Sequence, residues 1–428
     1  MTKYEKYAEY KDSGVKWFGS IPEHWSSFLF KRVVANIKDG THGTHARVEN
    51  GELLLSAKNV FNNGIEIGEN ESYIPFKDYE EITSNGFPKK GDILVTCVGT
   101  IGRSFVYPFD KSLAFQRSVS FMRLNKKGNP QFYKYFIESK AYQSQLESLI
   151  KSSAQGGIYM GDLINTVVIK CPLDEQIQIS NFLDHETAKI DSLIAKQEKL
   201  IELLKEKRQA VISHAVTKGL NPDVTMKDSG VEWLGQVPEH WLIGRLKNVL
   251  SIKNGRDYKS VEVEEGGYPV YGSGGIFKKS SDYLYDGVSI LFGRKGTIDK
   301  PLLVKGRFWT VDTMFYSELA KNICSEYVYF QSLGFPFDKL STNTALPSMT
   351  QEDLLNLGFA IPPIQEQIEI SKFIAEYLEK NHSLMEKAKQ AIQLMQERRT
   401  ALISSAVTGK IDVRNWQHPN EAKTEFSA

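Results

Sequence analysis

An internal repeat constrains this chain more than any other feature. Residues 11–25 (KDSGVKWFGSIPEHW) return at 227–241 as KDSGVEWLGQVPEHW. A second repeat lies further along each half, where residues 172–177 (PLDEQI) correspond to 363–368 (PIQEQI). Repeats this large are not solenoid units, and they indicate two similar domains in tandem. The residues between them have largely diverged, which predicts one scaffold used twice to hold two different surfaces.

Length and composition are those of a multidomain protein. A chain of 428 residues exceeds the size at which one core keeps growing. Its net charge of +1 says little about partners, since acidic helices can mask a basic face elsewhere. No apolar run approaches the roughly 20 residues of a membrane-spanning helix, and the start MTKYEK lacks the apolar core of a signal peptide. Cys97, Cys171 and Cys324 lie far apart, so we expect reduced thiols in the cytoplasm and neither a zinc site nor disulfides.

The diverged part of each half has the features of a mixed α/β domain with a strand-rich core. Glycines punctuate both stretches, and β-type apolar runs occur at 91–96 and 288–292. A faint common element is also present, because residues 99–103 (GTIGR) align with 296–300 (GTIDK).

The end of each half predicts a long helix. Apolar residues recur there at a spacing of three and four, which marks one stripe along a helix. The stripe comprises Ile190, Leu193, Ile194, Leu200, Ile201, Leu204, Val211 and Ala215 in the first copy, and Leu384, Met385, Ala391, Ile392, Met395, Leu402 and Ala406 in the second. Gly219 and Gly409 follow as helix stops. Each rod would be roughly 60 Å long, and we expect the two to pack antiparallel as a coiled coil, with the halves related by a pseudo-twofold axis.

Three motifs together resemble the specificity subunits of type I restriction-modification systems. They are the repeated S-G-V-x-W-x-G-x-(I/V)-P-E-H-W segment, the Gly-Thr-Ile element, and the P-(L/I)-x-E-Q-I start of each helix. The resemblance covers nearly the whole chain. It implies a non-catalytic subunit that reads a bipartite DNA target, one half-site per domain, and bridges two methyltransferase (modification) subunits. Restriction/translocase subunits would join the full complex, and S-adenosylmethionine, ATP and magnesium would bind to partner subunits, with no cofactor on this chain.

The same resemblance divides the chain into five segments. A first target-recognition domain is expected over 1–171 and a first long helix over 172–219. A second recognition domain would span 220–362, a second long helix 363–410, and a tail 411–428.

The catalytic motifs of the partner activities are missing from the sequence. It contains no G-x-x-x-x-G-K-(S/T) phosphate loop, no Asn-Pro-Pro-aromatic element of an amino-methyltransferase, and no pair of metal-binding histidine motifs. The run 271–275 (YGSGG) is a turn unless a strand precedes it and a helix begins after it. His42 and His45 lack further ligands nearby, so a polar loop is favoured over a metal pair.

Candidate DNA contacts are polar and basic residues in the diverged stretches. Arg and Lys can pair with guanine, and Asn and Gln with adenine, although most such contacts go to phosphates. The competing interpretation of any single one is a solvated side chain with no contact. The candidates are Lys38, Thr41, His42, Thr44, His45, Arg47, Lys58, Asn59, Arg103, Gln116, Arg117 and Gln155 in the first half, and Lys253, Asn254, Arg256, Tyr258, Lys278, Lys279, Arg294, Lys295, Lys300, Arg307 and Asn343 in the second.

Residues that are alike in both halves should serve what both halves share. Trp17, Trp25, Trp233 and Trp241 could stack on bases, but their place in the repeat favours packing or a common partner. Residues that differ should read different targets, so we expect an asymmetric target, with half-sites one DNA turn apart at about 10 base pairs.

Three other classes of function remain as alternatives. A bipartite DNA-binding regulator without an associated enzyme would share the basic loops, but would ordinarily be a homodimer of a short chain. A structural coiled-coil linker would explain the helices and not the two domains. A free-standing nuclease or methylase is disfavoured by the missing motifs. DNA binding that is strongest with a methyltransferase present would separate the first interpretation from these.

Overall fold

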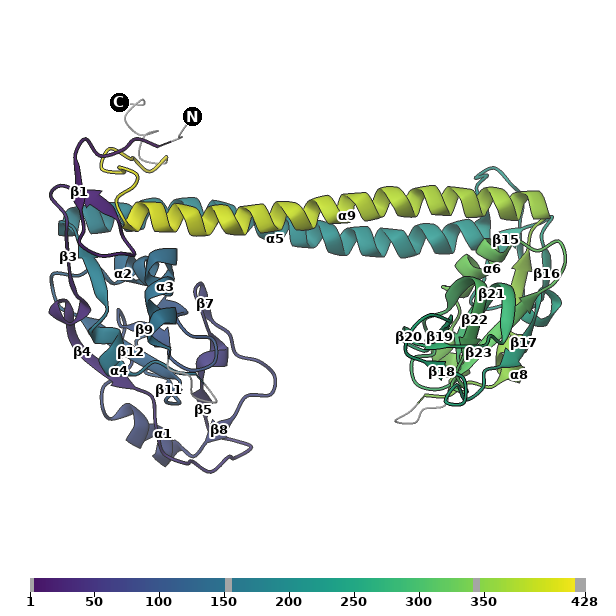
Figure 1. Cartoon of the computed structure of the whole chain (residues 1–428), viewed down its shortest axis with the longest axis horizontal. Coiled ribbons are helices and arrows are strands. Elements are labelled where there is room, and N and C mark those ends of the chain that lie inside the picture. Colours follow the sequence, from purple (N-terminus) through teal and green to yellow (C-terminus); the bar gives the residue numbers. More distant parts are fainter. Residues whose placement is uncertain (1–3, 151–155, 342–346, 420–428) are drawn as a thin grey trace. The chain divides into compact units, whose positions relative to one another are not determined.

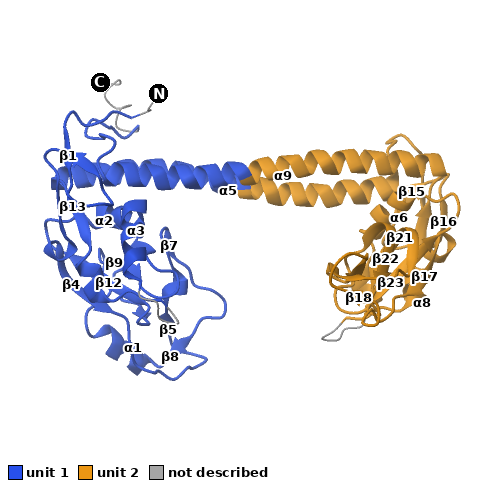
Figure 2. Ribbon diagram, viewed as in Figure 1, with its two compact units in different colours: residues 1–197, 390–428 blue, residues 198–389 orange. Residues whose placement is uncertain are grey.

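The computed structural model describes residues 4–150, 156–341 and 347–419. Two compact units divide the chain, residues 1–197 with 390–428 (unit 1) and residues 198–389 (unit 2), as Figure 2 shows. Each unit contains a strand-rich domain and one end of each of two long helices. The predicted mixed α/β class is therefore confirmed. Within the described ranges, none of the helices combines the length and the apolar character needed to cross a membrane.

Unit 1 begins with the repeated segment. Its strands β1 (Tyr10–Asp12) and β2 (Ser20–Pro22) form an antiparallel hairpin, and β3 (Ser26–Leu29) pairs with β13 (Val167–Lys170), far along the chain. The central sheet is antiparallel in the order β10-β9-β12-β4 (Figure 1). Its strands are β4 (Val34–Asp39), β9 (Ile93–Thr96), β10 (Ser104–Val106) and β12 (Val119–Leu124).

Smaller elements surround this sheet. A second sheet has the order β11-β5-β8, and β6 and β7 form a short ladder. The strands are β5 (Glu52–Leu55), β6 (Val60–Phe61), β7 (Gly64–Ile65), β8 (Tyr73–Ile74) and β11 (Ala114–Phe115). The helices are η1 (Phe30–Arg32), η2 (Ala57–Asn59), α1 (Phe76–Thr83), α2 (Pro130–Glu138), α3 (Lys140–Leu149) and α4 (Met160–Ile164). Asn129 caps α2 by accepting a hydrogen bond from Phe132 N, and Pro130 supplies a preset first turn.

Unit 2 repeats the framework around a larger sheet. Strands β14 (Met226–Asp228) and β15 (Gln236–Pro238) form the hairpin, and β16 (Leu242–Arg245) pairs with β24 (Gly358–Ile361). The seven-stranded sheet has the order β17-β23-β21-β22-β19-β20-β18. Its strands are β17 (Leu250–Asn254), β18 (Glu262–Val263), β19 (Tyr268–Gly272), β20 (Gly275–Ser280), β21 (Tyr285–Gly293), β22 (Leu302–Thr310) and β23 (Met314–Leu319). The remaining helices are η3 (Leu246–Asn248), α6 (Ser325–Ser332), α7 (Phe337–Leu340) and α8 (Gln351–Asn356).

The two predicted long helices are present as α5 (Leu173–Lys218) and α9 (Ile364–Val407). Gly219 and Gly409 follow them with φ of +74° and +71°, the left-handed conformation of a helix stop. In unit 1 the start of α5 lies beside the end of α9, and in unit 2 the end of α5 lies beside the start of α9 (Figure 1). The helices are therefore antiparallel within each unit, as predicted.

The apolar stripe is wider than the seam between two helices. Ile190, Ala215 and Ala406 are buried. Leu193, Leu200 and Leu384, which the stripe placed at the seam, remain 49%, 42% and 52% exposed, and so do Leu203 and Leu394. A pair of helices buries one face of each, so residues at the flank of the stripe stay in contact with solvent.

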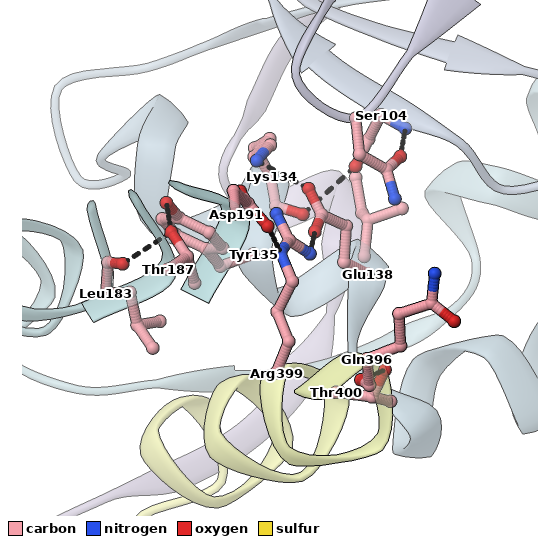
Figure 3. Close-up of polar contacts among 12 residues, drawn as sticks. Ser104, Lys134, Tyr135, Glu138, Leu183, Thr187, Asp191, Gln396, Arg399 and Thr400 are labelled. Atoms are coloured by element: carbon pink, nitrogen blue, oxygen red, sulfur yellow. Dashed lines mark hydrogen bonds and ion pairs between the residues drawn. The ribbon is translucent and has the colours of Figure 1, made fainter. Parts of the chain in front are cut away.

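A buried ion-pair cluster fastens α9 to unit 1 (Figure 3). Arg399 of α9 binds Glu138 of α2 at 3.2 Å and Asp191 of α5 at 2.9 Å. Lys134 lies one turn before Glu138 and pairs with it at 2.5 Å. Burial raises the pKa of the Glu138 carboxyl, and the charges of Lys134 and Arg399 offset that effect only in part. The cluster therefore links both long helices to α2 of the domain.

Candidate nucleic-acid interface

The repeated residues form the same contact, called the joint below, between the Pro-Glu-His-Trp segment and the first turn of a long helix in both units. In unit 1, Trp25 Nε1 donates to Glu175 Oε2 at 2.8 Å, and His24 Nε2 lies 2.6 Å from Glu175 Oε1. Glu175 is in the first turn of α5, where the helix dipole favours a carboxylate. The two repeated sequence segments therefore contact each other, which explains why they occur together.

Unit 2 has the corresponding joint at the start of α9. Trp241 Nε1 donates to Glu366 Oε1 at 3.0 Å, and His240 Nε2 lies 2.9 Å from Glu366 Oε2. Trp25 and Trp241 are completely buried, so they cannot stack on bases in this fold. The end of the other long helix closes each joint: a Cβ on Gly409 would lie 2.4 Å from Pro22 Cδ, so only glycine fits there.

The diverged residues of unit 1 surround a pocket of about 360 Å³. Asp39 at the end of β4, His42, and Gln116 and Arg117 between β11 and β12 line it. Asp39 Oδ1 accepts a hydrogen bond from Ser120 Oγ, and Asp39 Oδ2 lies 3.8 Å from His42 Nε2. Burial raises the pKa of the Asp39 carboxyl, while Ser120 and His42 oppose the change.

Several other candidates of unit 1 already have partners within the fold. His45 uses both ring nitrogens, on Thr41 Oγ1 at 2.9 Å and Asp78 Oδ2 at 3.0 Å. Asn59 is buried, and its amide bonds Ser56 N, Glu66 O and Glu71 Oε1. Lys58 pairs with Glu71 at 2.9 Å. These side chains hold the loop in shape, and in this conformation Asn59 has no free edge to offer a base.

The diverged residues of unit 2 also line a pocket, of about 250 Å³. Asn254 at the end of β17, Arg294 and Lys295 after β21, and Gln351 at the start of α8 line it. Gln351 Nε2 donates to Asn254 Oδ1 at 3.0 Å, so these two amides are held together. The structure thus brings together three of the predicted contacts of the second half.

Some of the remaining basic candidates form ion pairs within the fold, and others do not. Lys253, Lys278 and Arg307 face Glu318, Glu262 and Asp286 at 4.0, 2.6 and 2.8 Å. In the described part of the chain, no carboxylate pairs with the other basic candidates, which are Lys38, Arg47, Arg103, Arg117, Arg256, Lys279, Arg294, Lys295 and Lys300. Arg103 instead covers the Phe61 ring at 4.5 Å.

Other candidates have less distinctive places. Thr44 is exposed, and Tyr258 packs edge-on against Phe277. Gln155 and Asn343 lie outside the described residues. Within those residues, no group of three or more His, Cys, Asp or Glu side chains could hold a metal ion.

Tyr159 and Gln351 are among the pocket residues that were not anticipated from the sequence. Tyr159, which is 68% exposed, lines the pocket of unit 1, and Gln351 lines that of unit 2. Both lie at the start of a short helix, α4 or α8. A shared Asp-Leu pair, at 162–163 and 353–354, was the available signal that these helices correspond.

Comparison with known proteins identifies the family. The chain matches the family described as "Type I restriction modification DNA specificity domain" over residues 48–203 and 238–394, one match in each half of the repeat. The chain therefore belongs to the type I restriction-modification DNA specificity family, and the resemblance deduced from the repeated motifs is confirmed.

Individual relatives agree with this assignment. The type I restriction enzyme MjaVIII specificity subunit of Methanocaldococcus jannaschii is 26% identical over 310 residues, which cover 63% of this chain and 68% of the relative. The type I restriction enzyme EcoDI specificity subunit of Escherichia coli is 22% identical over 377 residues, 76% of this chain and 83% of the relative.

Two solved structures share the fold. One comes from a structure that describes complex assembly and conformational transition of the type I R-M system. Its chain aligns with a TM-score of 0.66 at 13% identity, and the alignment covers 90% of this chain and 98% of that one. The HsdS subunit from Thermoanaerobacter tengcongensis aligns with a TM-score of 0.53 at 13% identity, covering 91% and 98%.

Proposed function

We propose that this DNA specificity subunit reads a split, asymmetric target, with one half-site contacted by each unit. The observation that carries the proposal is the contrast between what repeats and what differs. Glu175 and Glu366 hold the same buried tryptophan contact in the two units. The pockets beside Asp39 and Asn254, by contrast, have different polar and charged linings. Two identical half-sites would require only one kind of surface.

The partners we propose are double-stranded DNA and two methyltransferase subunits. Leucines that stay exposed along the flank of the helix stripe offer apolar area to a second protein. Leu193 and Leu394 are such residues in unit 1, and Leu200, Leu203 and Leu384 in unit 2. They support one methyltransferase docking on the helices of each unit, and restriction/translocase subunits would complete the nuclease.

The chemistry would belong to those partners. S-adenosylmethionine would be held by the methyltransferase subunits, and ATP and magnesium by the restriction subunits, with this chain acting only in recognition. We place the complex in the cytoplasm, where the free thiols Cys97, Cys171 and Cys324 stay reduced.

Reconstitution with purified subunits tests this function. The chain alone, given S-adenosylmethionine, ATP and magnesium, should neither methylate nor cut DNA. Adding a cognate methyltransferase should give methylation at defined sequences and DNA binding that weakens steeply with salt, as expected for phosphate contacts. Robust catalysis by the chain alone, or methylation that is independent of the chain, would contradict the proposal.

A further inference from the structure

The pockets of the two units are built on the same backbone pattern. Four backbone hydrogen bonds that shape one pocket recur in the other. In unit 1 they join Gly40 N to Val119 O (3.0 Å), Thr41 N to Phe115 O (2.8 Å), Cys97 N to Ser118 O (2.8 Å) and Ile158 N to Cys97 O (2.9 Å). In unit 2 they join Gly255 N to Met314 O (3.0 Å), Arg256 N to Thr310 O (2.9 Å), Arg294 N to Thr313 O (2.8 Å) and Met349 N to Arg294 O (3.0 Å). The pockets are therefore equivalent sites of the internal repeat.

A glycine at the same point supports this equivalence. A Cβ on Gly40 would lie 2.3 Å from Gln116 O, and a Cβ on Gly255 would lie 2.0 Å from Val311 O. Neither position can accept a side chain without moving backbone. The strand end in each unit must therefore pass equally close to the loop across the pocket, and this fixes a common floor.

The side chains on this common backbone differ in a systematic way. Three equivalent lining positions carry Asp39, Val98 and Tyr159 in unit 1, and Asn254, Lys295 and Thr350 in unit 2. The position of the arginine in the repeat also differs. Unit 2 has Arg294 where unit 1 has the buried Cys97, and unit 1 has Arg117 where unit 2 has Asp312. Each pocket thus offers one arginine, from a different position of the repeat.

Arg294 is a half-buried cation without a carboxylate partner among the described residues, which suits it to bind a ligand. It is half-buried, and its guanidinium lies 6.0 Å from the Phe315 ring. Its Nη1 donates to the Asp312 carbonyl oxygen at 3.3 Å, and in the described residues no carboxylate neutralises its charge. Arg307 of the same unit, by contrast, is held by Asp286 and Tyr268.

We infer that these equivalent pockets are where each unit reads a base pair of its half-site, and that Arg294 reads a guanine for unit 2. The inference rests on the proposed function. A guanidinium fork matches O6 and N7 of guanine in the major groove. In unit 1 the corresponding donor is Arg117, which lines the pocket together with Asp39 but comes from a different position of the repeat. The same base pair presented to the two pockets would therefore meet different donors and acceptors, which makes the half-sites unlike.

Substitution of each arginine tests the inference. The full chain is expressed with its methyltransferase as wild type, Arg294→Gln, Arg117→Gln and Arg245→Gln, and the methylated sites in the genomic DNA of the cells are sequenced. Arg294→Gln should lower the preference for guanine at one position of one half-site by about 10- to 100-fold, and leave the other half-site unchanged. Arg117→Gln should alter only the other half-site. Arg245→Gln removes the same charge from the same unit, at an exposed side chain that bonds Asn356 Oδ1 and does not line the pocket, and should leave the motif intact.

The possible failures are distinguishable. An unchanged motif in Arg294→Gln, or an even loss of methylation at all targets, would mean that Arg294 contacts phosphate or nothing, and would overturn the pocket assignment. So would a motif change of the same size in Arg245→Gln. Loss of all methylation by both pocket variants, with thermal unfolding like that of the wild type, would also count against it. A wild-type complex that gives no bipartite motif would overturn the proposed function itself.

Discussion

Residues that repeat in the two halves have structural partners, and residues that differ surround the pockets. Trp241 illustrates the first class, because its indole N–H is buried and bonded to Glu366. Trp233, in the same repeated segment, has a buried Nε1 with no hydrogen-bond partner in the described structure. Two tryptophans eight positions apart therefore differ in one interaction that a matched pair of substitutions can isolate.

Replacing Trp241 with phenylalanine should destabilise unit 2 more than replacing Trp233 does. Both changes remove an indole N–H and shrink a ring, but only Trp241→Phe removes a hydrogen bond to the Glu366 carboxylate, which keeps its contact with His240. Loss of a hydrogen bond to a charged group costs about 2 kcal/mol, so the melting temperature should fall by roughly 4–8 °C more than in Trp233→Phe. Thermal unfolding followed by circular dichroism measures this. Equal losses in the two variants would contradict the assigned role.

At the scale of elements, the long helices were the part of the fold most open to sequence reasoning. Their period of 3.6 and their stop glycines are local signals, and α5 and α9 follow them closely. The exposed leucines show the limit of that reasoning, because the apolar pattern does not predict how many helices pack against the stripe. The order of the sheets was not predictable, since pairs such as β3 with β13 join strands far apart in sequence.

The candidate site was predictable to a similar extent. Arg294, Lys295 and Asn254 were chosen for their chemistry, and the structure brings them to one pocket. Tyr159 and Gln351 were missed because bridges between distant segments, Val98 with Gly157 and Lys295 with Ser348, place them there. Asn59 has suitable chemistry but is turned into the fold.

The ion-pair cluster gives a prediction about α9. Arg399→Met should leave Glu138 buried with Lys134 alone, and should destabilise unit 1 by roughly 3 kcal/mol, as for a broken buried pair. Lys199→Met removes a lysine whose pair with Glu202 is exposed, and should leave the free energy of unfolding almost unchanged. Unfolding in denaturant compares the two. Similar stabilities would mean that the cluster does not hold α9 to the domain.

The same variant should respond to pH in a defined direction. Burial already raises the Glu138 pKa above its ordinary value of 4.5, and loss of Arg399 should raise it further. A carboxyl with a raised pKa in the folded state contributes stability at low pH, and that contribution is lost as pH rises through the folded pKa. The deficit of Arg399→Met relative to the wild type should therefore be smaller near pH 5 than near pH 8. A deficit that grows toward acid would contradict this account.

At the scale of the whole molecule, both long helices cross from one unit to the other. If they set the distance between half-sites, a seven-residue insertion in both should lengthen the pair by about 10 Å and keep the heptad in register. We expect insertions after Gln197 and after Lys389, where the units divide, to lengthen the preferred spacer by roughly three base pairs and leave both half-sites unchanged. Sequencing of methylated sites measures this.

Three-residue insertions at the same positions are the matched control. They would break the heptad and rotate one unit against the other by about 100° per residue, so methylation should be lost. A seven-residue variant that kept the original spacer at full efficiency would contradict the role of the helices as a ruler.

The most direct measurement of the central claim is the complete set of methylated sites in cells that carry this chain and its methyltransferase, compared with cells that lack the chain. We predict one motif made of two short, different half-sites separated by a spacer of fixed length, present only when the chain is present. A palindromic motif would contradict the claim that the two units read different sequences. Methylation that persists without the chain would contradict its role in recognition altogether.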